Sequence, residues 1–192
     1  MKNNEMSMAV GDGFLIEDGK LMPLEVTIKQ LMRVFKVNRV WTLVSEAKDT
    51  NVGEHLLLTS LLAMKFTQRA DWEDNRRNKM IVVALTHDLH ESMTGDVMPA
   101  YKTDLLRETE EHIDKLLEEQ YGKPSLGDKE YRFVKFCDRL SFLWEMRNRG
   151  SAETSLKERA LMLALHKHVQ DFPDKEKRVA ETMIEEILAG KL

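Results

Sequence analysis

The stretch HDLHESMTGD, residues 87–96, decides how this 192-residue chain is interpreted. It begins with His87 and Asp88, an imidazole beside a carboxylate. A lone His55 precedes it and a lone Asp138 follows it, each within a different predicted helix. Metal sites in helical bundles are built from side chains on facing helices, so these two imidazoles and two carboxylates can surround one divalent ion. The pattern therefore indicates a hydrolase that uses a metal-bound water.

Neighbouring residues on a helix project about 100° apart, so His87 and Asp88 can reach one ion only near a helix end or at a bend. We expect the loop that starts at Ser92 to provide that end. Glu91 follows His87 by four residues and therefore lies on the same helix face. Its carboxylate is predicted to act on the bound water instead of binding the metal.

Each of these residues also has a purely structural interpretation. His55 can be a partly buried core histidine, and Asp138 can pair with Arg139 on a solvated face. A His-Asp pair occurs by chance in many chains, so the pair alone does not specify a metal site. His90 is expected on the surface. The other helical histidines are expected to have no functional role: His112, His166 and His168.

Composition is typical of a globular protein, with 42% hydrophobic, 32% charged and 7% aromatic residues. The formal net charge of −4 gives no electrostatic reason to expect binding to a nucleic-acid polymer or to an anionic membrane. The single cysteine, Cys137, excludes an intrachain disulfide. No apolar stretch approaches the roughly 20 residues that a membrane span needs. We therefore expect a soluble cytoplasmic protein.

Hydrophobic periodicity predicts an all-α fold, a helical bundle with a small β-hairpin near the N-terminus. Asp18 and Gly19, between two short apolar runs, are typical of a two-residue hairpin turn. We expect a hairpin extension over residues 1–24 and a single helical core over residues 25–192. Helices are predicted around His55 and Asp138 and over residues 25–37, 80–91, 104–121, 153–171 and 175–188.

Two boundaries are predicted from local chemistry. Asp49 or Thr50 is expected to cap the helix that carries His55, because both are good N-cap residues. The charged run over residues 71–79 is expected to form a turn before the apolar helix that leads to His87.

A wider set of motifs resembles the HD-domain phosphohydrolases. The segment HDLHESMTGDVMPAYK, residues 87–102, is similar to the pattern HD-x-x-E-x-x-TGD-x-P-x-P-x-K of the bacterial 5'-deoxyribonucleotidases. Asn38-Arg39 and NVGEH, residues 51–55, are similar to that family's NR-W and NVSEH segments. KFCDRL, residues 135–140, is similar to its K-x-x-D-x-L segment. The resemblance implies the HD-domain helical bundle.

The resemblance also implies residue roles. Glu91 matches the catalytic carboxylate, and Asp96 matches a second acid near the reacting phosphate. Arg39 matches the arginine that contacts the phosphate, Trp41 matches a tryptophan that shapes the sugar pocket, and Lys102 matches a basic residue after the TGD loop. The residues that match the metal ligands are His55, His87, Asp88 and Asp138.

The chain departs from the family pattern at two places. Val40 separates Arg39 from Trp41, whereas the family's tryptophan follows its arginine directly. The first proline after the TGD motif is also displaced, to Pro99. Both departures lie where the resemblance places the substrate, so the preference for sugar or base can differ from that of the familiar enzymes.

These motifs predict a phosphohydrolase that binds one divalent ion (Co, Mn, Zn or Mg) and converts deoxynucleoside monophosphates to deoxynucleoside and phosphate. The alternative with the same chemistry is a deoxynucleoside triphosphate triphosphohydrolase, for example on dATP. A non-enzymatic nucleotide sensor is a further alternative, but every metal and acid position of the family is present. A helical interaction module would leave the Glu91 and TGD pattern unexplained. A nucleotide is the expected ligand, and a homodimer is the expected assembly.

Overall fold

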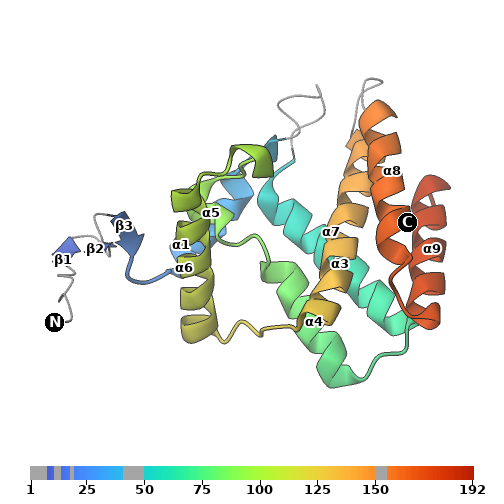
Figure 1. Cartoon of the computed structure of the whole chain (residues 1–192), viewed down its shortest axis with the longest axis horizontal. Coiled ribbons are helices and arrows are strands. Elements are labelled where there is room, and N and C mark those ends of the chain that lie inside the picture. The colour runs from blue at the N-terminus through green and yellow to red at the C-terminus, as the bar shows by residue number, and fades with distance from the viewer. Residues whose placement is uncertain (1–7, 11–13, 18–19, 41–49, 150–154) are drawn as a thin grey trace.

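A computed structural model describes residues 8–10, 14–17, 20–40, 50–149 and 155–192 of the protein. Helices make up most of it, and a small antiparallel sheet lies at its N-terminal end (Figure 1). The predicted all-α class is therefore confirmed. None of the described helices combines the length and the apolar character that crossing a membrane requires.

The elements follow one another along the chain with short connections. The strands are β1 (Met8–Val10), β2 (Phe14–Glu17) and β3 (Lys20–Pro23). The first helical elements are α1 (Ile28–Leu31), the 3-10 helix η1 (Met32–Lys36), α3 (Val52–Arg69), α4 (Asp74–Thr86) and α5 (Glu91–Thr94). The later ones are the 3-10 helix η2 (Pro99–Tyr101), α6 (Asp104–Tyr121), α7 (Asp128–Arg149), α8 (Ser155–Val169) and α9 (Asp174–Leu188).

The predicted hairpin is present as β2 and β3, which pair antiparallel with Glu17 opposite Lys20. A third strand, β1, pairs with the outer edge of β2, and the sequence did not predict it. Beyond the sheet, α1 begins with a capping box, in which the side chains of Thr27 and Gln30 satisfy each other's backbone N–H groups.

Two predicted boundaries are corrected by the structure. The N-cap of α3 is Asn51, whose side chain accepts a hydrogen bond from the backbone N–H of Glu54 at 2.9 Å, so the prediction of Asp49 or Thr50 is wrong. Asp49 itself lies outside the described residues. The run over residues 71–79 is mostly helical, because α4 begins at Asp74. Its acidic first residue complements the positive end of the helix dipole.

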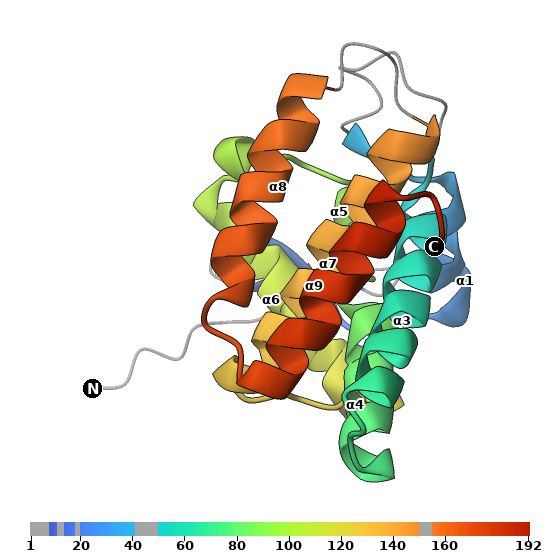
Figure 2. The same ribbon diagram turned by 90° about the vertical axis from the view of Figure 1, so that its right-hand side faces the viewer.

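The main core lies between α3, α4, α7, α8 and α9, which pack side by side (Figure 2). Phe66 is fully buried at its centre. Its ring centroid lies 5.4 Å from that of Phe133, 5.8 Å from that of Phe136 and 5.9 Å from that of Trp72. The tilted and edge-on arrangements suit the quadrupoles of aromatic rings.

Two smaller apolar clusters hold the segment between α4 and α5. One contains Val26 and the buried stripe of α6, and the other contains Val34 and the first turns of α3. Leu89, in the middle of the segment, packs against both clusters. The HD stretch is therefore fixed by contacts with three separate parts of the chain.

Phe66→Ala is expected to destabilise the fold by about 3–5 kcal/mol, because it removes a large ring from a closed aromatic cluster. Thermal unfolding followed by circular dichroism measures this loss. The matched control is Leu163→Ala on α8, whose side chain is 73% exposed and whose change is expected to stay within about 0.5 kcal/mol. Equal losses in both variants would contradict the placement of the core.

Candidate metal centre

Three helices bring the four predicted metal ligands together. His55 lies in the first turns of α3, His87 is the C-cap residue of α4 with Asp88 directly after it, and Asp138 lies in the middle of α7. These helices contact one another, and α3 and α7 lie side by side in both ribbon views (Figures 1 and 2). Residues up to 83 positions apart in sequence thus converge, as the spacing from His55 to Asp138 shows.

The donor atoms of the cluster lie within a few ångströms of one another. His55 Nε2 is 3.2 Å from Asp138 Oδ1, and His87 Nε2 is 3.3 Å from Asp88 Oδ2. The cross distances are 3.8 Å from His87 Nε2 to Asp138 Oδ1 and 3.9 Å from His55 Nε2 to Asp88 Oδ2. All four side chains therefore face one small volume.

His87 and Asp88 converge because α4 stops at Thr86, directly before them. The chain continues in tight turns, in which the backbone N–H of Leu89 bonds to Thr86 O at 3.3 Å and that of Glu91 bonds to Asp88 O at 3.1 Å. The prediction that the helix continues to the loop at Ser92 is therefore wrong. The earlier end removes the 100° separation that a regular helix would impose on the pair.

Hydrogen bonds orient both imidazoles toward the cluster. His87 Nδ1 is 2.9 Å from Ala84 O, and because a carbonyl only accepts, this nitrogen carries a proton. His55 Nδ1 lies 3.0 Å from Ser141 Oγ and 3.3 Å from Glu145 Oε1. Both Nε2 atoms are buried, face the cluster and make no hydrogen bond with the described residues. Such partners on the far nitrogen are typical of metal-binding histidines.

The charges of the cluster fit a bound cation. Burial alone would lower the pKa of His87, but Asp88 and Asp138 outweigh it and raise this pKa to about 10. Burial would likewise raise the pKa of Asp88, but His87 lowers it well below its usual range. The two carboxylates thus hold positive charge between them, which a divalent ion with nitrogen and oxygen ligands would supply. The orphaned nitrogens and the donor set together fit such an ion.

Glu145 and Ser141 are supporting residues that the sequence analysis did not find. Glu145 is 2% exposed, yet it carries a carboxylate, and Ser141 donates to Asp138 O at 2.8 Å. Asp138, Ser141 and Glu145 are three and seven residues apart on α7, which places them on one helix face. That spacing, among the apolar residues of the buried face of α7, is the signal that could have identified them.

Glu91 and Asp96 lie beside the cluster in different settings. Glu91 opens α5 and is 4% exposed, and its Oε2 atom has no hydrogen-bond partner among the described residues. Burial raises the pKa of Glu91 to about 9, and the charges of Asp88 and Asp96 add to this effect. Asp96 instead accepts a hydrogen bond from the backbone N–H of Val40 at 2.8 Å. Glu91 thus holds a proton at neutral pH, whereas Asp96 is held in place by its hydrogen bond to the backbone of Val40.

The predicted substrate-contacting residues differ in how they lie relative to the metal cluster. The Arg39 guanidinium lies 3.9 Å from Asp88 and 4.0 Å from Asp96, so it is at the cluster. Lys102 is tied to Glu110, whose two carboxylate oxygens lie 2.7 Å and 2.9 Å from its ammonium group. Trp41 lies outside the described residues.

His90 is not on the surface, which corrects the prediction made for it. It is 8% exposed and lies between two carboxylates of α6, with Nε2 3.7 Å from Glu110 Oε1 and Nδ1 3.6 Å from Asp114 Oδ1. The early end of α4 explains this, because the turn that follows directs His90 toward α6.

The chain belongs to the HD-domain family, whose profile matches residues 32–160. Its fold is similar to that of a cyanophage S-2L HD phosphohydrolase, DatZ, solved bound to dA and one catalytic Zn²⁺ ion. That match has a TM-score of 0.73 at 20% identity and covers 87% of this chain and 99% of the other. A structural-genomics protein designated APC5600 matches with a TM-score of 0.54 at 19% identity, over 83% of this chain and 92% of its own. The comparison with curated proteins found no match.

Glu145→Gln is expected to weaken metal binding about 10- to 100-fold, because the His55 imidazole loses the carboxylate beside Nδ1. Isothermal titration with Mn²⁺ or Zn²⁺ measures the affinity. The control is Glu185→Gln, an exposed position on α9 with the same change of charge. If both variants bind metal as tightly as the unaltered protein, Glu145 does not support the site.

Proposed function

We propose that the protein is a divalent-metal-dependent phosphohydrolase of deoxynucleotides. The principal reaction is the conversion of a deoxynucleoside 5'-monophosphate and water to the deoxynucleoside and orthophosphate. The observation that carries this proposal is the meeting of nitrogen and oxygen donors from three helices beside Glu91, a buried carboxyl group with a raised pKa. Membership of the HD-domain family and the fold shared with an HD phosphohydrolase support it.

The ion would be held by His55, His87, Asp88 and Asp138. A bound divalent cation supplies Lewis acidity, which lowers the pKa of water and polarises a phosphoryl oxygen. The ligand atoms of His55, His87 and Asp138 all lie within 4.8 Å of one another, and those of Asp88, His90 and Glu91 form a second such group. Asp88 Oδ2 also lies 3.9 Å from His55 Nε2 and 3.3 Å from His87 Nε2. Asp88 therefore joins the metal cluster to the residues that handle protons.

Protons are carried by Glu91 and Asp96. One of these carboxyl groups accepts the proton of the attacking water, and the other supplies a proton to the leaving 5'-oxygen. The Glu91 Oε2 atom is free to make either contact, since it has no partner among the described residues. The hydrogen bond from Val40 keeps Asp96 at the edge of the cluster.

The substrate phosphate is positioned by Arg39. Its planar guanidinium suits a bidentate contact with phosphate, and the site already holds it close to Asp88 and Asp96. Burial would lower the pKa of Arg39, but Glu145, Asp96 and Asp88 outweigh it and raise this pKa. Lys102 is near enough to lower the pKa of Glu91, but its charge is paired with Glu110, so Arg39 is the main contact for the phosphate.

A triphosphohydrolase reaction, which releases tripolyphosphate from a deoxynucleoside triphosphate, is the second candidate. The observation that favours it is an additional cation next to the cluster, since Lys135 Nζ lies 3.6 Å from Asp138 Oδ2. A longer phosphate chain needs more positive charge along its length than a single phosphate does.

The homodimer and the cytoplasmic location stay predictions. Part of the surface suits an interface, because apolar side chains at helical spacing are exposed on α3 and α4. They are Leu57, Leu61, Met64, Val82 and Leu85, each between 40% and 53% exposed.

The double variant His87→Ala/Asp88→Ala is expected to lose bound metal and hydrolysis together, because two of the four ligands are removed. Metal content is measured by mass spectrometry. Activity is measured on a panel of mono- and triphosphates, ribo and deoxy, with several metals. Orthophosphate from dAMP indicates the nucleotidase, and tripolyphosphate from dATP indicates the second candidate. His166→Ala/Asp174→Ala, an exposed pair of the same composition, is the control. Hydrolysis retained in the HD double variant would end the proposal.

Glu91→Gln is expected to bind metal with unchanged affinity and to lose about 10²–10⁴ in kcat, because the amide cannot carry the proton. Steady-state kinetics on the preferred substrate, together with metal titration, separate the two effects. Unchanged turnover would remove Glu91 from the mechanism.

A further inference from the structure

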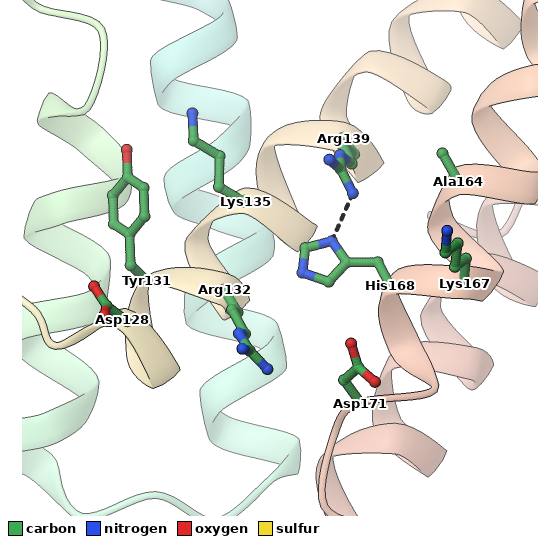
Figure 3. A pocket seen from close by; sticks show the side chains of 9 residues that line it. All are labelled: Asp128, Tyr131, Arg132, Lys135, Arg139, Ala164, Lys167, His168 and Asp171. Atoms are coloured by element: carbon green, nitrogen blue, oxygen red, sulfur yellow. Dashed lines mark hydrogen bonds between the residues drawn. The ribbon is translucent and has the colours of Figure 1, made fainter.

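A pocket of about 650 Å³ lies between α7 and α8 (Figure 3). Its charged lining consists of four cations and two carboxylates: Arg132, Lys135, Arg139, Lys167, Asp128 and Asp171. Four positive and two negative groups leave a local charge of +2, whereas the whole chain carries −4. The pocket is therefore locally positive, although the protein as a whole has a net negative charge.

Three of these four cations have no ion-pair partner among the described residues. Within the described part of the chain, no carboxylate lies within 4.0 Å of the charged groups of Arg132, Arg139 or Lys167. Arg139 instead donates a hydrogen bond to Nδ1 of His168 at 2.9 Å (Figure 3). Like charges that gather without partners repel one another, so an anion bound among them would be favoured.

His168 shows that the pocket is electropositive. A guanidinium has no acceptor, so the Nδ1 atom that receives the Arg139 hydrogen bond is unprotonated. Burial lowers the pKa of His168, and the charges of Arg139 and Arg132 lower it further, although Asp171 opposes them. The imidazole is neutral at neutral pH, and its Nε2–H group is a donor. His168 was expected to have no functional role, and its imidazole lines this pocket.

Lys135 connects the pocket to the metal centre. Its side chain lines the pocket, and its ammonium group lies 3.6 Å from Asp138 Oδ2. The pocket and the metal cluster therefore share one cation.

We propose that this pocket binds the polyphosphate chain of a nucleotide. Two guanidinium groups offer planar forks for phosphate oxygens, and two ammonium groups offer point charges. The volume lies in the range of small-ligand sites and accommodates several linked phosphates. The bound polyphosphate belongs either to the substrate itself or to a second nucleotide that regulates the enzyme. The nucleotide identity of the ligand rests on the proposed function, whereas the binding of a polyphosphate does not.

The test compares two charge-matched variants of the full chain. Arg139→Gln/Lys167→Gln removes two pocket cations, and Lys157→Gln/Arg178→Gln removes two exposed helical cations outside the pocket. Inorganic tripolyphosphate is titrated into metal-free protein at low salt. We expect the pocket variant to bind at least about tenfold more weakly, since charge-assisted hydrogen bonds are lost. The control should bind as the unaltered protein does.

A local readout accompanies the titration. Tripolyphosphate is expected to raise the pKa of His168, measured by NMR of its imidazole and assigned with His168→Gln. An absence of binding, equal weakening in both variants, or orthophosphate binding as tight as tripolyphosphate would each overturn the inference.

Two further measurements show which nucleotide the polyphosphate belongs to. They also separate the inference about the pocket from the proposed phosphohydrolase function. A higher KM for dATP with an unchanged KM for dAMP in the pocket variant indicates the substrate's tail. Loss of a tripolyphosphate effect on the rate, with both KM values unchanged, indicates a second nucleotide. The variant His87→Ala/Asp88→Ala should still bind tripolyphosphate, so the inference survives even if no nucleotide is hydrolysed. Loss of binding in that variant would place the anion at the metal centre and overturn it.

Discussion

Two carboxylates held against two buried imidazoles impose a requirement for positive charge at the centre of this fold. Asp88 and Asp138 each lie within 4.0 Å of both histidine Nε2 atoms, so the negative charges of both carboxylates face the same small volume. A proton on His87 meets the requirement in part, and Arg39 and Lys135 contribute from two sides. The surrounding helices serve to keep these groups in place.

The same requirement explains the residues behind the cluster. Glu145 and Ser141 hold the far nitrogen of His55, and Ala84 O holds that of His87, so both Nε2 atoms point toward one volume. Apolar packing then fixes the backbone, through Phe66 between the helices and Leu89 in the segment between α4 and α5. The hydrogen bonds that orient the imidazoles and the apolar packing of the core thus act on the same helical turns.

Much of this arrangement could be predicted from sequence because it depends on local patterns. Helical periodicity predicted the fold class, and the convergence of His55, His87, Asp88 and Asp138 followed from donor chemistry and a family resemblance. The early end of α4 was not predicted, because Leu89 continues the apolar period of the helix even though the chain has turned. His90 was misplaced for the same reason. Glu145 was missed because only the folded structure brings its carboxylate to His55, 90 positions away. The charged pocket depends on which faces of α7 and α8 meet, which no single helix encodes.

The hydrogen bond from His87 to Ala84 O makes the last turn of α4 part of the metal centre. The carbonyl that fixes the imidazole lies three residues upstream, and Leu89 is clamped two residues downstream. Insertions and deletions between Ala84 and Glu91 would rotate the imidazole away from its ligand position even if every donor were retained. The connection between α6 and α7 holds none of the residues assigned to the site, so a change of length is expected to be tolerated there.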